Sequence, residues 1–429
     1  MSLTNSSYLL IDGNIMGCGY NGNGQLGLGD SIDGKNVFTK VDNVDNVKQI
    51  SCGGYHTFIL LNDGTIMSCG RNNYGQLGMG DTTDRSIFTK VPDISNVKQI
   101  SCGQYHTFIL LNDGTIMSCG YNGSGQLGTG GSSNKYSFTK VGNISNVKQI
   151  SCGGDHTFIL LNDGTIMGCG RNSKGQLGLG TSTADEWSFK KVNVSGSIKQ
   201  IICGDSHTFV LLNDGTIMGC GNNYDGQLGT GDKNNRKLFA KIDNIDNVKQ
   251  ISCGGNHTFI LLNDGTIMSC GYNGSGQLGV DSVTNRVMFT EIHGINVKQI
   301  ICGSQHTFIL LKDGTVMSCG YNGSGQLGVG NTVNKYVFDK IESVNPSNVT
   351  QYLISKVSNN MELFTIDINN ERLIIPTTVK DTPLFNNGFS SLSLLVNDTQ
   401  YGKPIDKILE TFSLYKQGAT TETYISLWE

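Results

Sequence analysis

Cysteine and histidine recur together along this chain of 429 residues, in a spacing that resembles a metal site. In the stretch CGGYHTFILLNDGTIMSCG, Cys52, His56 and Cys69 offer thiol and imidazole groups, which are ligand types that zinc prefers. The same trio returns at regular intervals as far as residues 302–319, and no fourth ligand accompanies it. A metal in every repeat would be an unusual requirement. We therefore interpret the cysteines as buried small apolar groups and each histidine as bonded to neighbouring backbone, and we expect no metal and no cofactor.

Residues that could act in catalysis also follow the repeat. Asp63 and its equivalents lie in an Asn-Asp-Gly turn, where the backbone geometry of the turn demands these residue types. A nucleophile with its general base should occur once, outside the repeated pattern, and the sequence offers no such set. The glycine-rich stretch CGYNGSGQLG lacks the lysine and the following helix that a phosphate-binding loop needs. We expect a protein that is not an enzyme and has no catalytic residues.

Composition and charge restrict the classes of partner. The chain has a net charge of −4 and a pI near 6.0, which gives no bulk electrostatic reason to bind nucleic acid or an anionic membrane. The N-terminal residues do not resemble an export signal, and apolar runs such as FILL are too short to cross a bilayer. We expect a cytoplasmic protein whose thiols are reduced, because disulfides are rare in the cytosol.

The sequence GQLG recurs at a nearly constant spacing. Each unit contains four short β-prone runs, VKQISCG, HTFILL, TIMSCG and FTKV, with the Asn-Asp-Gly hairpin signal between the second and the third. Nothing in the unit has helical periodicity. Four antiparallel strands in each of seven units predict an all-β, seven-bladed β-propeller. The copies of GQLG begin at Gly24, Gly75, Gly125, Gly175, Gly226, Gly276 and Gly325.

The two ends of the repeat region predict how the ring closes. Residues Tyr8 to Gly19 match the second and third strands of a unit, and nothing before them supplies a first strand. The segment NVTQYLI resembles the missing strand, so we expect residues 349–354 to complete the first blade and close a propeller of residues 1–355. Residues 356–429 differ in composition and predict a small α+β appendage. Within it, Pro404–Gly418 has the pattern of an amphipathic helix.

The repeated run G…H-T-x-x-L…D-G-x-[IV]…C-G-x-N…G-Q-L-G-x-G resembles the repeat of the regulator of chromosome condensation family. Within that family, the chain resembles the alpha-tubulin-suppressor-like sub-group. This resemblance implies a seven-bladed propeller closed by its two ends. Where that family has an aromatic residue and then Trp-Gly, this chain has Met67 and Cys69, which implies a softer core. The family's best-known activity is guanine-nucleotide exchange on a small GTPase. The resemblance implies that members with this activity use an extra wedge that projects from one blade. The unit spacings of 49 to 51 residues leave no room for such an insertion here.

The differences between copies lie in two loops of each unit. In an up-and-down blade, the loop after the first strand and the loop after the third emerge on one face, so CGxxH and CGxNxxG should share it. Tyrosine and arginine, which are enriched in binding hot spots, occur at these variable positions. Neutral drift of exposed loops would give similar variation. The residues predicted to bind a partner are Tyr55, Arg71, Tyr74, Tyr105, Tyr121, Asp155, Arg171, Lys174, Asp205, Tyr224, Asp225, Tyr272, Gln305 and Tyr321.

These observations favour a non-enzymatic scaffold that binds a protein partner through the variable loop face. The alternative is a guanine-nucleotide exchange factor for a small GTPase. In either case we expect a monomer that binds neither nucleic acid nor membrane. The near-identity of the copies and the bias toward Asn, Ile and Lys resemble proteins of large DNA viruses, which would place the chain in host cytoplasm or a virion.

Overall fold

The computed structural model describes residues 6–11, 13–32, 34–182 and 184–342, together with three short strands nearer the C-terminus. The chain divides into two compact units, Met1–Asn360 and Met361–Glu429. The predicted closing strand 349–354, the boundary predicted at residues 355 and 356, and the predicted helix Pro404–Gly418 lie outside the described residues. None of the described segments forms a helix with the length and apolarity that a bilayer crossing requires.

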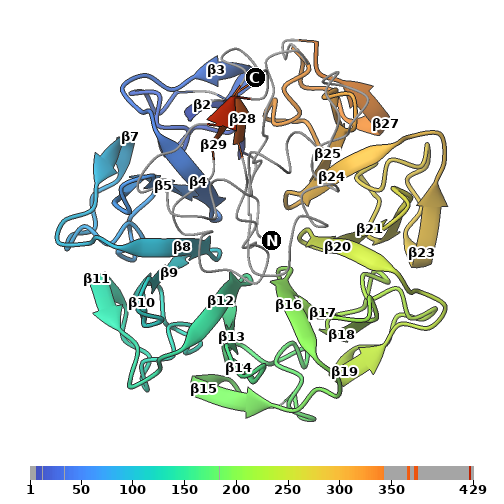
Figure 1. Cartoon of the computed structure of the whole chain (residues 1–429), viewed down its shortest axis with the longest axis horizontal. Helices are drawn as coiled ribbons and strands as arrows, with labels where there is room; N and C mark the ends of the chain where they lie inside the picture. The colour runs from blue at the N-terminus through green and yellow to red at the C-terminus, as the bar shows by residue number, and fades with distance from the viewer. Residues whose placement is uncertain are drawn as a thin grey trace. The chain divides into compact units, whose positions relative to one another are not determined.

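The first unit is a seven-bladed β-propeller (Figure 1), as the repeat predicted. A complete blade is an antiparallel meander, for example β4 (Val47–Cys52), β5 (His56–Leu61), β6 (Ile66–Gly70) and β7 (Arg85–Lys90). The first strand of each such blade lies nearest the central axis and the fourth lies at the rim. Among the described residues, the first blade has three strands, and its missing strand is the one for which residues 349–354 are predicted.

The remaining strands repeat this order. The first blade contains β1 (Ser6–Ile11), β2 (Asn14–Gly19) and β3 (Lys35–Lys40). The third and fourth blades contain β8 (Val97–Cys102), β9 (His106–Leu111), β10 (Ile116–Gly120), β11 (Lys135–Lys140), β12 (Val147–Cys152), β13 (His156–Leu161), β14 (Ile166–Gly170) and β15 (Glu186–Val192). The last three contain β16 (Ile198–Cys203), β17 (His207–Leu212), β18 (Ile217–Gly221), β19 (Arg236–Lys241), β20 (Val248–Cys253), β21 (His257–Leu262), β22 (Ile267–Gly271), β23 (Arg286–Ile292), β24 (Val297–Cys302), β25 (His306–Leu311), β26 (Val316–Gly320) and β27 (Lys335–Lys340).

Local chemistry sets the hairpin between the second and third strands. Gly64 has a φ of +81°, a conformation that glycine adopts without steric cost. The Asp63 carboxylate accepts hydrogen bonds from the Thr65 backbone N–H and hydroxyl, both at 2.8 Å. Both bonds lower the pKa of the Asp63 carboxyl, and the bond from the backbone N–H has the larger effect. The aspartate therefore holds the turn, as expected from its repetition in every blade.

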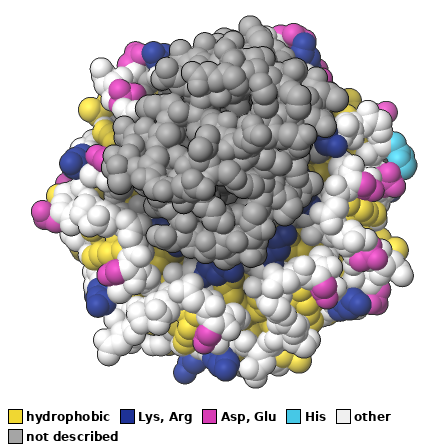
Figure 2. All heavy atoms as spheres, in the orientation of Figure 1, with side chains coloured by type: hydrophobic (Ala, Val, Ile, Leu, Met, Phe, Trp, Pro, Cys, Tyr) yellow, Lys and Arg dark blue, Asp and Glu magenta, His cyan; other side chains and the backbone are white. Residues whose placement is uncertain are grey.

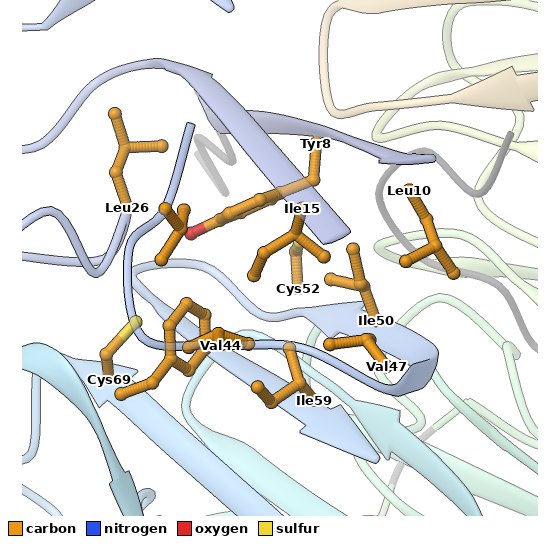
Figure 3. Packing of buried hydrophobic residues seen from close by; sticks show 12 residues of the cluster. Tyr8, Leu10, Ile15, Leu26, Val44, Val47, Ile50, Cys52, Ile59 and Cys69 are labelled. Carbon is orange, nitrogen blue, oxygen red and sulfur yellow. The ribbon is translucent and has the colours of Figure 1, made fainter. Parts of the chain in front are cut away.

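The hydrophobic core lies between blades rather than within one layer. Strand β5 is buried along almost its whole length, because both faces of its sheet pack against neighbouring blades. In Figure 3, Tyr8 and Ile15 of the first blade pack against Ile50 and Ile59 of the second. Rim strands such as β7 instead keep most side chains at least partly exposed. Each blade is therefore stabilised mainly by its neighbours, as in other repeat architectures.

The first and last blades close the ring through described residues. Phe38 of β3 meets Phe308 of β25 edge to face, with 6.2 Å between ring centroids. The Cys18 thiol donates to the Gln326 carbonyl at 3.4 Å, and the backbone N–H of Gly330 donates to the Asn36 carbonyl at 2.8 Å. These contacts show a closed propeller independently of the predicted pairing through residues 349–354.

The described part of the second unit is a small antiparallel sheet. It consists of β28 (Thr365–Asp367), β29 (Arg372–Ile374) and β30 (Ile425–Ser426), with β29 in the middle. Strands β28 and β29 both fall within the segment MELFTIDINNERLII.

Candidate protein-binding face

Each repeated histidine forms a bridge to the next blade. The Nε2 atom of His56 lies 2.8 Å from Thr107 Oγ1, whose hydroxyl donates to the Gln76 carbonyl at 2.9 Å. Because the hydroxyl proton is used there, the histidine Nε2–H must be the donor to threonine. The prediction that the histidine bonds to backbone is therefore wrong, since its partner is a side chain one blade away. The equivalent pairs are His106–Thr157, His156–Thr208, His207–Thr258, His257–Thr307 and His306–Ser7.

Burial favours the neutral form of His56, His257 and His306. It lowers the pKa of His56 and His257 to about 3 and that of His306 to about 4. The imidazole of His56 packs directly on Gly53, where an added Cβ would lie 2.1 Å from the ring carbon Cε1. A neutral, fully buried imidazole that donates to a threonine stabilises the contact between two blades. It is not placed to transfer protons to a ligand.

The cysteines also belong to the junctions. The Cys69 thiol donates to the Gln25 carbonyl of the first blade at 3.3 Å, and Cys102 donates to the Ser51 carbonyl of the second at the same distance. All thirteen cysteines are buried and free, and burial raises the pKa of the Cys302 thiol to about 12. Among the described residues, no cluster of three or more His, Cys, Asp or Glu side chains is placed to hold a metal ion.

At four junctions a glutamine of the innermost strand fixes the next blade around the axis. The Gln99 amide donates to the Ile150 carbonyl at 2.9 Å and accepts from the Ile150 backbone N–H at 3.0 Å. The loops that follow these strands then join backbone to backbone. Gly54 donates to the Gln104 carbonyl, and Gln104 donates to that of Gly154, both at 3.0 Å. Glycine-rich loop segments such as Gly53–Gly54 line a small opening on the axis.

The loop after the third strand is held against the loop after the first. The backbone N–H of Arg71 donates to the Tyr55 carbonyl at 2.9 Å, which confirms that CGxxH and CGxNxxG emerge on one face. The Asn72 carboxamide oxygen accepts from the Leu77 backbone N–H at 2.9 Å and stiffens the loop from within. Gly75 approaches the next blade so closely that an added Cβ would lie 2.4 Å from the Tyr136 Cα. Rigid loops thus present the variable side chains.

The second and third blades bring five of the predicted residues together. Tyr55 stacks on Tyr105, with 6.0 Å between centroids and an interplanar angle of 18°. Tyr74 contacts Tyr105 at 5.4 Å and Tyr121 at 5.0 Å between centroids. The guanidinium carbon of Arg71 lies 5.7 Å from the ring centroids of both Tyr55 and Tyr105. All five side chains are partly exposed.

Tyr20 of the first blade extends this group, with its ring centroid 6.4 Å from that of Tyr55. Sequence reasoning missed it, although Tyr20 occupies the same repeat position as Tyr121 and could have been found by that alignment. We refer to Tyr20, Tyr55, Tyr74, Tyr105, Tyr121 and Arg71 as the tyrosine cluster.

The fourth and fifth blades carry a more polar group. Arg171 forms an ion pair with Asp155 at 3.5 Å. Burial raises the pKa of the Asp155 carboxyl, and Arg171 opposes that shift. The Lys174 ammonium lies 4.6 Å from the ring centroid of Tyr224, whose side chain is 56% exposed. Arg171 and Lys174 therefore each contact another side chain of the same face.

The other predicted residues make contacts of their own. Asp225 accepts a hydrogen bond from the Asn285 amide at 3.0 Å, and Asp205 lines the axial opening. The hydroxyl end of Tyr272 lies against Gly274, where an added Cβ would be 2.2 Å away, and Tyr321 lies in the same way against Gly323. Gln305 is partly exposed, and its carbonyl accepts from the Tyr321 backbone N–H.

Acidic and basic side chains both occur around the rim of the ring in Figure 2. The rim strands are not fully open edges. The backbone N–H of Gly29 donates to the Ser86 carbonyl of β7 at 2.9 Å, so the preceding blade covers one end of that edge. Trp187 lies on the rim strand β15 and is 40% exposed.

Comparison with known proteins agrees with this architecture. The sequence pattern of the RCC1-like domain matches residues 133–359, and that of the regulator of chromosome condensation (RCC1) repeat matches residues 12–60 and 63–110. A second RCC1 repeat pattern matches residues 47–76 and 97–126. The chain therefore belongs to the family of RCC1-repeat propellers.

Short segments are similar to proteins of diverse function. The chain is 39% identical over 77 residues to the ultraviolet-B receptor UVR8 of Arabidopsis thaliana, which is 18% of this chain and 17% of the receptor. It is 37% identical over 76 residues to the secretion-regulating guanine nucleotide exchange factor of Bos taurus, which is 17% of this chain and 16% of that protein. In each case the matched region spans less than a fifth of the relative's length.

Solved structures match over most of the chain. Human WBSCR16 superposes with a TM-score of 0.69 at 22% identity, covering 79% of this chain and 94% of that one. Yeast RCC1 (Prp20), in a complex with Kap60, gives 0.67 at 21% identity, covering 79% and 83%. At these identities the likeness shows the fold.

Proposed function

We propose that the propeller is a non-enzymatic scaffold that binds a protein partner through the face formed by the CGxxH and CGxNxxG loops. The observation that supports this most is the tyrosine cluster, in which partly exposed aromatic side chains from three successive blades contact one another around Arg71. Rigid aromatic residues and arginine contribute most of the energy at many protein interfaces. The opposite face carries the nearly invariant Asn-Asp-Gly turns, which offer little to distinguish one partner from another.

Affinity capture from the source cell tests this proposal. Reversal of charge at Arg71 and Arg171, to Glu at both positions, should remove partners that the unaltered chain captures. The melting temperature should fall only slightly, because the Arg171 side chain that pairs with Asp155 is half exposed. The matched control reverses Lys90 and Lys191, two exposed rim-strand lysines whose charges act on the turn aspartates Asp63 and Asp163. Loss of partners in the control, or their retention in the Arg71 and Arg171 variant, would exclude this face.

Guanine-nucleotide exchange on a small GTPase is the second candidate function. Two observations favour it: the matched segment of a secretion-regulating guanine nucleotide exchange factor, and the fold shared with Prp20, whose reported binding properties concern Gsp1p and histones. Catalytic amounts of the chain should then accelerate release of labelled GDP from at least one member of a panel of small GTPases. A panel without acceleration would leave the scaffold as the remaining proposal.

A further inference from the structure

Arg71 is an unpaired cation held on an aromatic surface. Its guanidinium lies over the rings of Tyr55 and Tyr105, and no carboxylate in the described part of the chain forms an ion pair with it. With the Asn73 amide oriented to satisfy its neighbours, its oxygen accepts from Arg71 Nη2 at 3.2 Å, and its nitrogen donates to Asp84. A guanidinium has five N–H donors, so most of those of Arg71 remain available to a ligand.

Three other arginines of the ring, Arg85, Arg171 and Arg236, differ in this respect. Arg171 occupies the same repeat position two blades later and is paired with Asp155. Arg85 and Arg236 are paired with Asp81 and Asp232 at 2.7 and 2.8 Å. Of these four arginines, only Arg71 lacks an internal counter-charge. Arg286 also forms no ion pair among the described residues, but it begins the rim strand β23 and its Nε atom is buried.

The arrangement favours an anionic partner over a cationic one. A cationic ligand would use the faces of aromatic rings, but Arg71 already lies over two of them and would repel a second positive charge. A planar guanidinium matches a carboxylate through two parallel hydrogen bonds. The adjoining rings of Tyr74 and Tyr121 offer an apolar surface next to that charge.

We propose that the tyrosine cluster binds an acidic segment of a protein partner, in which one carboxylate pairs with Arg71 and a neighbouring apolar side chain packs on the tyrosine rings. This inference rests on the proposed scaffold function and specifies the chemistry of its partner. A single-stranded nucleic acid would also stack on tyrosine, but one unpaired cation offers little to a row of phosphates.

Fluorescence anisotropy with labelled probes tests the inference directly. A short peptide of alternating glutamate and phenylalanine should bind the chain, and its counterpart with glutamine in place of glutamate should bind about tenfold more weakly, as expected when a charge-assisted hydrogen bond is lost. Arg71→Gln should weaken binding of the glutamate peptide by a similar factor. Arg236→Gln, which removes an arginine with an internal partner, should leave its binding unchanged.

Three results would overturn the inference: equal binding of the two peptides, no binding of either at millimolar concentration, or tighter binding of an oligothymidylate. Affinity capture distinguishes rejection of the acidic-segment proposal from rejection of the scaffold function. If reversal at Arg71 and Arg171 still removes cellular partners while the peptides do not bind, the scaffold stands and only the acidic chemistry is rejected.

Discussion

The Nε2 atom of His306 lies 2.9 Å from the Ser7 hydroxyl, although the two residues are 299 positions apart in the sequence. Ser7 occupies the place that threonine holds in the other six blades, so the junction that closes the ring uses the same bond as those within it. Ser6 stands where those blades have histidine, and the junction between the first and second blades is built differently. Within the first blade the Tyr8 hydroxyl donates to the Gln25 carbonyl, which also accepts from the Thr57 hydroxyl of the second blade at 3.0 Å. The Tyr8 ring meets Phe88 of the second blade edge to face.

Removal of a bridging histidine should destabilise the ring. In His306→Ala the Ser7 hydroxyl loses its partner and a small cavity forms, and we expect a loss of about 1–3 kcal/mol in the free energy of unfolding. Urea denaturation followed by circular dichroism measures this loss. His293→Ala is the matched control, because the His293 side chain is 80% exposed and should change stability little. Equal stability of His306→Ala and the unaltered protein would show that the bridge contributes nothing.

Stability should fall as the solution becomes acidic. His56, His257 and His306 have pKa values of about 3, 3 and 4 in the folded chain, below the ordinary value of 6.5. Above pH 6.5 these residues are neutral in both states and have no effect. Below it the unfolded chain takes up protons that the folded chain does not, so each histidine lowers stability by about 1.4 kcal/mol per pH unit until the folded pKa is reached.

The urea midpoint measured from pH 7.5 downward checks this expectation. His257→Asn should reduce the dependence on pH between 6.5 and 4, because the altered residue does not titrate. A midpoint that is flat across this range in the unaltered protein would contradict the account of buried neutral histidines.

The second glycine of GQLG should tolerate no side chain. Gly78 has a φ of +70°, and an added Cβ would lie 2.6 Å from Cε2 of the Phe138 ring in the next blade. Gly78→Ala should therefore lower stability by at least about 1 kcal/mol, from backbone strain and from overpacking. Gly131→Ala is the control, because an added Cβ there meets nothing within 4 Å. Similar melting temperatures for the two variants would refute the close approach.

The repeat made the blades predictable because each strand and turn is encoded locally. The Asn62-Asp63-Gly64 turn and the short β-prone runs fix the meander without reference to other units. The sequence predicted the ends of the strands less accurately than their order. The rim strand β3 begins at Lys35, three residues before the predicted FTKV, because Gly19 pairs with Lys35 after a shift in register.

Contacts between blades could not be predicted in the same way. The partner of His56 is Thr107, 51 residues later, and hydrophobic patterning does not encode how one sheet faces the next. The loop positions of the binding face followed from strand direction alone. The clustering of Tyr20, Tyr55 and Tyr105 could not be predicted from strand direction, because it depends on side-chain directions in three separate blades.

Hydrogen exchange of the chain with and without its captured partner tests the assignment of binding to the loop face most directly. We predict slower exchange at the backbone amides of Gly54–Tyr55 and Arg71–Gly75 in the complex, with exchange at Asn62–Thr65 in the opposite turns unchanged. Protection confined to the Asn-Asp-Gly turns, with the loops around Arg71 unaffected, would contradict the account.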